Sequence, residues 1–154
     1  MKALLQRTTQ ASVTIAAQEV GSIKKGIVVL LGIEKNDTQE IAEKCLQKLL
    51  NYRIFSDDEG KINLSAKDID ADLLIVSQFT LAADTKKGLR PGFSTAAPPQ
   101  EAKALYHFFV NQCQALTQGT KSKVATGSFG ADMQVALIND GPVTFLLEFS
   151  DKNN

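Results

Sequence analysis

Apolar and polar residues alternate over the first third of the chain in the pattern of β-strands. Three short strands and a fourth, continuously apolar one are predicted at residues 1–7, 11–16, 19–23 and 27–33. We expect these segments to form an antiparallel meander. A second apolar run, 73–76, predicts a central strand that continues into the polar residues 77–80.

Apolar residues at helical spacing predict two helices. Asp37 is expected to cap the first, with Glu40 as its partner in a capping box, and the apolar face is formed by Ile41, Ala42, Cys45, Leu46, Leu49 and Leu50. Pro98 and Pro99 lead the second, whose apolar face is formed by Ala102, Leu105, Phe109, Cys113 and Leu116. His107 lies off this face.

The last third of the chain predicts two more strands, 133–138 and 143–149, joined as a hairpin by Asn139-Asp140-Gly141-Pro142. Strand-rich ends with two main helices and no repeated βαβ alternation favour an α+β fold with an antiparallel, barrel-like sheet. We assign a single domain to residues 1–149 and a polar tail to residues 150–154.

Composition and charge narrow the class of protein. Of 154 residues, 17 are Lys or Arg and 17 are Asp or Glu, so the formal net charge is zero. No overall field would attract a polyanion, and any nucleic-acid contact has to be local. The longest mainly apolar stretch, 26–33, is too short to span a membrane, and residues 1–7 lack an apolar segment of signal-peptide length. We therefore expect a cytoplasmic protein without a membrane partner.

Few side chains are available for metal binding or nucleophilic catalysis. Cys45 and Cys113 lie in separate segments without a Cys-x-x-Cys or Cys/His cluster, so we expect two buried thiols and no metal, cofactor or disulfide. His107 is the only histidine. We interpret it as structural, because no acidic residue lies near it in the sequence, and this disfavours serine-hydrolase chemistry.

Ser77-Gln78-Phe79-Thr80 ends an apolar strand with polar side chains. Such groups either face a pocket or are satisfied by neighbouring backbone as the strand leaves the core. Strand alternation would place Ser77 with Phe79 on one face and Gln78 with Thr80 on the other. The segment alone leaves both interpretations open.

The segment Asn139-Asp140-Gly141-Pro142 also has two interpretations. It is a good hairpin connector, but a Gly-Pro bond can be cis, which turns two successive carbonyl oxygens the same way as a rigid probe. Arg7 could fork onto backbone carbonyls of this turn or be a plain surface charge. The short basic groups are expected to be solvated surface rather than phosphate contacts: Lys86, Lys87, Arg90, Lys121 and Lys123.

Several sequence blocks, spread over almost the whole chain, carry a family resemblance. They are Leu4-Leu5-Gln6-Arg7 with Ala11-Ser12-Val13, followed by residues 29–35, 51–57, 76–81, 88–91, 129–133 and 139–144. In their order and spacing they resemble the D-aminoacyl-tRNA deacylase family, from Met1 to about Phe149.

The resemblance implies a homodimeric hydrolase that cleaves the ester between a D-amino acid, or glycine, and the 3′ end of tRNA, as chiral proofreading in translation. It implies that Ser77, Gln78 and Thr80 form the catalytic floor of a pocket for the terminal adenosine and its amino acid. The walls of the pocket would be Phe79, Phe129 and Met133.

The same resemblance implies a gate supplied by the partner subunit. Its Gly141-Pro142, held cis and braced by Arg7, would point two carbonyl oxygens at the α-carbon of the substrate. An L-side chain would collide with them, whereas a D-side chain would point away and glycine would pass. Such a gate works by exclusion, so one clash at Cβ rejects every L-amino acid.

Thr80 is a candidate nucleophile in the family, but a threonine hydroxyl needs a base and the only histidine is poorly placed. The alternative is that the 2′-hydroxyl of the tRNA helps to activate water or the ester, while the protein positions the substrate and supplies backbone donors. Two departures from the family pattern are Gly92, where serine is common, and Ala16-Ala17-Gln18, which replaces a Gly-containing turn.

Three competing functions remain at the level of the sequence. A related enzyme with a trans Gly-Pro bond would accept some L-aminoacyl-tRNAs. A small RNA-binding module is disfavoured by the neutral charge and the lack of an aromatic stacking series. A dimeric structural domain predicts that changes at Ser77, Gln78 or Gly141 alter stability alone.

Overall fold

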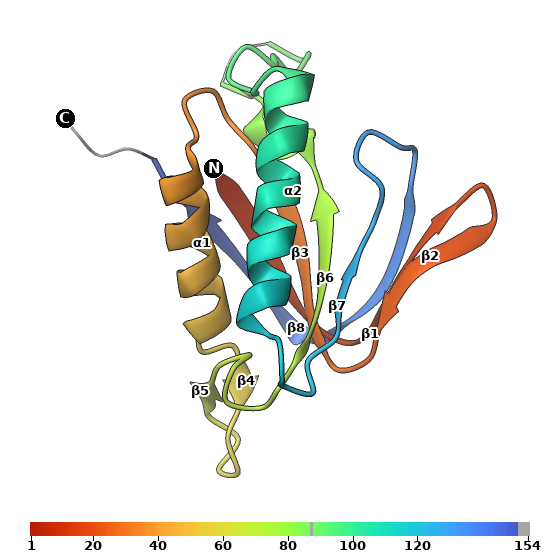
Figure 1. The fold of residues 1–154 in the computed structure, drawn as a ribbon, viewed down its shortest axis with the longest axis vertical. Helices are drawn as coiled ribbons and strands as arrows, with labels where there is room; N and C mark the ends of the chain where they lie inside the picture. The colour runs from red at the N-terminus through yellow and green to blue at the C-terminus, as the bar shows by residue number, and fades with distance from the viewer. Residues whose placement is uncertain (87, 151–154) are drawn as a thin grey trace.

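A computed structural model describes residues 1–86 and 88–150, so Lys87 and residues 151–154 of the predicted tail lie outside the described residues. Figure 1 shows the fold. Its elements in chain order are β1 (Lys2–Ile15), β2 (Gln18–Ile23), β3 (Gly26–Gly32), α1 (Gln39–Asn51), β4 (Phe55–Ser56), β5 (Ile62–Leu64), β6 (Asp72–Ser77), the 3-10 helix η1 (Phe79–Ala82), α2 (Pro99–Leu116), β7 (Val124–Thr126) and β8 (Gln134–Glu148).

One mixed sheet organises the fold. β1 pairs antiparallel with β2, β3 and β8, whereas β6 pairs parallel with both β3 and β7. The predicted α+β class with two main helices is confirmed, but the prediction of an antiparallel sheet is wrong for these strands. Parallel neighbours need a long crossover connection, and α1 and α2 lie in the connections from β3 to β6 and from β6 to β7.

The sheet curls until it is nearly closed, which confirms its barrel-like character. β2 approaches β7 so closely that a Cβ built on Gly21 would lie 2.5 Å from the carbonyl oxygen of Thr126. Only glycine fits such an approach of two backbones. Among the described residues, β8 pairs with β1 alone, so its other edge is free.

Apolar layers lie on both faces of the sheet. α1 and α2 lie side by side over one face (Figure 1), where they pack on strand residues that include Leu5, Val29 and Ile75. A second buried cluster on the other face includes Val13 and Val28. Neighbouring residues of β3 thus point to opposite buried faces, which explains its continuous apolar run.

Both predicted helices are present, but the predicted cap of the first is wrong. Thr38 caps α1, since its Oγ1 accepts a hydrogen bond from the Ile41 amide at 3.2 Å. Asp37 instead accepts hydrogen bonds from the Glu34 amide and from the amino group of Met1, each at 2.7 Å. Burial at this position raises the pKa of the Asp37 carboxyl, against the lowering effect of these partners.

Two pairs of predicted strands are single long strands. β1 runs through residues 8–10, where a break was expected, and β8 runs through residues 139–142, so the predicted hairpin there is wrong. Long-range pairing between β1 and β8 outweighs the local turn chemistry of Asn-Asp-Gly-Pro. Residues 51–71 contain the short pair β4 and β5.

The Asn-Asp-Gly-Pro segment forms a bulge in β8 rather than a turn. Gln6 pairs with Thr144 and Thr8 with Asn139, so residues 140–143 of β8 lie opposite Arg7 alone. Asn139 closes the bulge: its Oδ1 accepts from the Val143 amide and its Nδ2 donates to Thr144 Oγ1, both at 2.8 Å. Gly141 and Pro142 are therefore displaced from regular pairing and exposed.

The turn between β1 and β2 uses residues that are unfavourable for it. Ile15 pairs with Gln18, so Ala16 and Ala17 form a two-residue hairpin turn, with φ of 47° and 64°. Positive φ at both positions favours Asn-Gly, because a Cβ is strained there. The departure noted in the sequence at this turn therefore has a structural cost.

We expect the double substitution Ala16→Asn, Ala17→Gly to raise the free energy of unfolding by about 1–2 kcal/mol, because each alanine in the left-handed region costs roughly 1 kcal/mol. Urea unfolding measures this change. Ala104→Gly on the exposed side of α2 is the control, since adding glycine to a helix should destabilise by about 1 kcal/mol. Destabilisation by the turn substitution as well would contradict this account of the hairpin.

In the described part of the chain, the structure contains no helix that is both long and apolar enough to cross a membrane.

Candidate functional site

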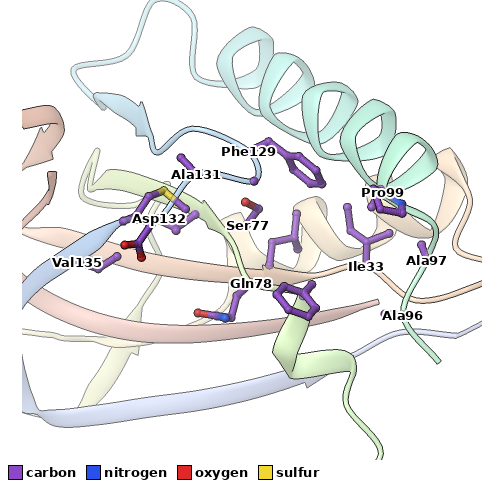
Figure 2. Close-up of a pocket in the computed structure, with 16 residues that line it drawn as sticks. Ile33, Ser77, Gln78, Ala96, Ala97, Pro99, Phe129, Ala131, Asp132 and Val135 are labelled. Atoms are coloured by element: carbon purple, nitrogen blue, oxygen red, sulfur yellow. The ribbon is translucent and has the colours of Figure 1, made fainter. Parts of the chain in front are cut away.

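A cavity of about 470 Å³ lies where the end of β6, the start of α2 and the segment before β8 meet (Figure 2). This volume is within the roughly 300–1,000 Å³ of small-molecule sites. Its lining is mainly apolar and comprises Leu31, Ile33, Val76, Ser77, Gln78, Phe79, Ala96, Ala97, Pro99, Ala102, Phe129, Gly130, Ala131, Asp132, Met133 and Val135. Five residues singled out from the sequence are thus brought together: Ser77, Gln78, Phe79, Phe129 and Met133.

The floor of the cavity is the point at which β6 ends. Ser77 is the last strand residue and pairs with Leu31 of β3, and the Gln78 amide donates to the Leu31 carbonyl at 2.8 Å. The chain then turns into η1, so the predicted strand alternation over residues 77–80 is wrong beyond Ser77. Close packing fixes the turn, since a Cβ built on Gly32 would lie 3.1 Å from the Gln78 carbonyl oxygen.

Gln78 orients Thr80 by a direct hydrogen bond. The Gln78 side-chain amide donates to Thr80 Oγ1 at 2.6 Å. Thr80 is exposed on η1 and does not line the cavity, although its partner Gln78 does. A hydroxyl oxygen that accepts a hydrogen bond from an amide loses electron density to it, which is the reverse of activation by a base. The geometry therefore gives Thr80 no sign of an activated nucleophile.

The walls of the cavity come from two loops. One is the segment that leads into β8. In Figure 2, Phe129 of this segment lies on the side of α2, and Gln78, which follows β6, lies opposite Phe129. The other contains Ala96 and Ala97, and is fixed by the hydrogen bond from the Ala97 amide to the Ile33 carbonyl at 3.1 Å. Both loops are anchored by backbone hydrogen bonds, so the walls of the cavity are largely preformed.

Aromatic surface is exposed beside the cavity. Phe79 on η1 is 60% exposed and its ring centroid lies 5.0 Å from that of Phe93, which is 41% exposed. Exposed phenylalanine rings next to a cavity favour an apolar or stacking ligand group over a strongly charged one. The sequence pattern gave no indication of this role for Phe93.

The described residues that line the cavity include no histidine and no cysteine. His107 is exposed on α2 and does not line the cavity. Burial raises the pKa of both the Cys45 and the Cys113 thiol to about 12, so neither supplies a thiolate near neutral pH, and the prediction that both are buried is confirmed. Asp132 is the one charged residue among the described lining residues.

No metal-binding cluster of three or more His, Cys, Asp or Glu residues occurs within residues 1–86 and 88–150.

The second predicted group, Arg7, Gly141 and Pro142, lies away from this cavity. In the sheet, β1 and β3 lie between β8 and β6. Along β8, Gly141 is six residues from the lining residue Val135, which is about 20 Å at roughly 3.3 Å per residue. The peptide bond between Gly141 and Pro142 is cis. One chain thus holds both predicted groups but does not bring them together.

Arg7 is buried and holds the base of the bulge. Its Nε donates to the Asp140 carbonyl at 2.8 Å and its Nη1 donates to the Ile54 carbonyl at 3.0 Å. Nε also lies 3.3 Å from the Asp140 carboxylate. The guanidinium therefore braces backbone carbonyls, which is one of the two interpretations of the sequence. Within the bulge it binds the carbonyl of Asp140 and not those of Gly141 or Pro142.

The short basic groups lie on the surface. Lys86, Arg90, Lys121 and Lys123 are exposed, whereas Lys87 lies outside the described residues.

Comparison with known proteins defines the family. The sequence model of the family described as D-Tyr-tRNA(Tyr) deacylase matches residues 4–148. The chain belongs to the D-Tyr-tRNA(Tyr) deacylase family. A deacylase of this kind is a hydrolase, so the resemblance identified from the sequence blocks and the enzyme class it implied are confirmed.

Individual relatives agree with this assignment over nearly their whole length. A D-aminoacyl-tRNA deacylase of Pseudomonas fluorescens strain SBW25 is 62% identical over 148 residues, which are 96% of this chain and 99% of the relative. One of Pseudoalteromonas translucida strain TAC 125 is 58% identical over 147 residues, again 96% of this chain and 99% of the relative.

Solved structures share the fold. A structure titled c-Myc DNA Unwinding Element Binding Protein superposes with a TM-score of 0.89 at 44% identity, covering 96% of this chain and 98% of that one. A probable eukaryotic D-amino acid tRNA deacylase superposes with a TM-score of 0.79 at 18% identity, covering 95% and 97%. The second similarity supports the fold alone.

Sequence reasoning missed much of the cavity lining. Ala96 and Ala97 are small residues in a loop, and their role depends on a backbone bond to Ile33 that no local pattern signals. Asp132 precedes Met133 in one of the blocks that carry the resemblance. This position was the one signal in the sequence that Asp132 lines the cavity.

Proposed function

We propose that this chain hydrolyses the ester between a D-amino acid, or glycine, and the 3′-terminal adenosine of tRNA, and rejects L-aminoacyl-tRNA. The observation that carries the proposal is the cavity in a member of this family, floored by Ser77 and Gln78 and flanked by Phe79 and Phe129. Its size and mainly apolar lining suit a nucleoside with an attached amino acid. We place the activity in the cytoplasm, where translation provides the substrate.

The mechanism follows from what the cavity provides. A water oxygen bonds to the ester carbonyl carbon, the bond from that carbon to the ribose oxygen breaks, and a proton passes to the ribose oxygen. No histidine or cysteine lines the cavity among the described residues, and the 2′-hydroxyl of the terminal ribose is the group proposed to assist the water. Ser77 and Gln78 position the ester, and backbone amides stabilise the developing oxyanion.

Chiral selection is assigned to a second subunit. The partner's Gly141 and Pro142 would cover the cavity and present their carbonyl oxygens to the α-carbon. An L-side chain then meets two rigid acceptors, whereas a D-side chain or a hydrogen does not. The support within one chain is that Gly141 and Pro142 are exposed on a bulge whose base is held by Arg7.

A homodimer is also supported by apolar surface on the same strand. Ile138 and Leu146 of β8 are 53% and 49% exposed, and Leu146 pairs in register with the half-buried Leu4 of β1. Large exposed aliphatic groups are favourable sites for burial against a second subunit. The isologous symmetry of a dimer would place both bulges against both cavities.

The test is time-resolved hydrolysis of matched D-tyrosyl-, L-tyrosyl- and glycyl-tRNA by the purified protein. Rapid loss of the D-tyrosyl and glycyl esters with an intact L-tyrosyl ester is the expected result. Equal loss of both tyrosyl esters would contradict the gate and leave a deacylase of different specificity. No turnover with retained tRNA binding would favour an RNA-binding module instead.

We expect Thr80→Ala to keep the single-turnover rate within about threefold of the wild-type rate, because Thr80 lies outside the cavity lining and accepts its hydrogen bond from an amide. Rapid-quench assays with D-tyrosyl-tRNA measure the rate. Thr85→Ala, at an exposed position beyond η1, is the matched control. A loss of about 1,000-fold or more at Thr80 alone would restore a nucleophilic role.

A further inference from the structure

Tyr106 contacts two of the segments that surround the cavity. It stands on α2 one turn after the lining residue Ala102, and only 2% of its surface is exposed. Its hydroxyl donates to the Ile75 carbonyl at 2.8 Å. Its ring centroid lies 5.7 Å from that of Phe129, with the ring planes at 46°. One side chain therefore contacts both the strand that leads to the floor and the wall that carries Phe129.

The Ile75 carbonyl is where the elements around the cavity meet. Ile75 precedes Ser77 by two residues in β6, and its carbonyl also accepts from the Gly127 amide at 3.3 Å. Gly127 precedes Phe129 by two residues. The same oxygen thus joins α2, the strand that carries the floor and the segment that carries the wall.

We propose that Tyr106 is a positioning residue of the deacylase site, which holds Ser77 and the Phe129 wall at a fixed separation; this inference rests on the proposed function. Burial raises the pKa of the Tyr106 hydroxyl to about 12, so it remains a donor across the neutral range. Without that hydroxyl, the Ile75 carbonyl still accepts the longer bond from the Gly127 amide at 3.3 Å but loses its link to α2.

The effect on the reaction should be on rate more than on affinity. Ester hydrolysis without an activated side chain depends on the alignment of water, ester and ribose, which is sensitive to displacements well below 1 Å. The apolar contacts of the adenosine with the cavity tolerate such displacements better than the reacting atoms do. A change at Tyr106 should therefore lower the rate constant at saturating substrate and leave the KM almost unchanged.

The test compares Tyr106→Phe with the matched control Tyr52→Phe. Each variant loses one hydroxyl and keeps its ring, and Tyr52 lies at the end of α1 with its ring against Phe145 at 5.2 Å. Single-turnover hydrolysis of D-tyrosyl-tRNA over a range of enzyme concentrations separates rate from affinity for the wild type and both variants. The thermal midpoint of each protein is measured in parallel.

The inference predicts a rate about tenfold lower for Tyr106→Phe, with the half-saturating concentration within about twofold of wild type and no comparable change for Tyr52→Phe. A rate within about twofold of wild type, with or without a lower thermal midpoint, would overturn the positioning role while leaving the proposed function intact. An inactive wild-type protein would overturn the proposed function itself, and the inference with it.

Discussion

Replacing Gly32 by alanine is expected to lower the rate of D-tyrosyl-tRNA hydrolysis by about 10- to 100-fold, because sub-ångström displacement of a catalytic segment has effects of this size. A Cβ on Gly32 would lie 2.8 Å from Leu81 Cβ and 3.1 Å from the Gln78 carbonyl oxygen. Neither neighbour is the free end of a flexible side chain. The residues that move are therefore those of the cavity floor and η1, although Gly32 itself does not line the cavity.

Gly92→Ala is the matched control for this prediction. Gly92 lies near the same region of the fold, but a Cβ there would be in ordinary contact, 3.8 Å from the Asp84 carbonyl oxygen and 3.9 Å from Asp84 Cβ. Its activity should remain within about twofold of wild type. Equal activities of the two variants, with Gly32→Ala folded by circular dichroism, would mean that the position of Gln78 in the cavity floor does not control the rate.

The second large effect is expected at Gly141. Gly141→Ala should reduce the ratio of D-tyrosyl to L-tyrosyl hydrolysis by about tenfold or more, because selection by exclusion fails when the excluding atoms move. Gly141 has φ of +136°, and a Cβ there would lie 2.6 Å from Val143 Cγ2 and 3.1 Å from Arg7 Nη2. A built Cβ would also lie 3.1 Å from the Val143 backbone nitrogen, so we expect the backbone of the bulge to adjust and to move the carbonyl oxygens at Gly141 and Pro142.

Gly119→Ala separates this effect from a general cost of positive φ. Gly119 has φ of +84° with nothing within 4 Å of a built Cβ, so the substitution strains the backbone without a clash. Both variants should lose roughly 1 kcal/mol of stability from the backbone alone, but only Gly141→Ala should change the ratio of the two rates. An unchanged ratio together with lower stability would favour the interpretation of Gly141 as purely structural.

The parts of the fold that sequence predicts well depend on local patterns. Apolar residues recur at helical spacing in α1 and α2, so both helices are found. The predicted apolar face of α1 is buried, whereas Leu116 at the end of the predicted face of α2 is 40% exposed. The polar end of β6 stands out because hydroxyl and amide groups follow an apolar strand. These signals lie within a few residues and do not require knowledge of the tertiary fold.

The parts that sequence predicts poorly depend on distant partners. Asn139 to Pro142 has the composition of a hairpin turn, yet pairing with β1 and the contacts of buried Arg7 hold it as a bulge in one strand. The parallel direction of β6 follows from the crossover through α1, which no property of its own residues reveals. Ala96 and Ala97 form a wall for the same kind of reason, because a hydrogen bond to Ile33 fixes them.

The most direct test of the central claim is a crystal structure with an amide-linked, non-hydrolysable D-tyrosyl-adenosine analogue. The account predicts that the nucleoside and the amino acid occupy the cavity against Ser77 and Phe129, with the carbonyl oxygens of the partner's Gly141 and the partner's Pro142 next to the α-carbon. An analogue bound outside this cavity, or a dimer in which both bulges lie far from both cavities, would contradict it.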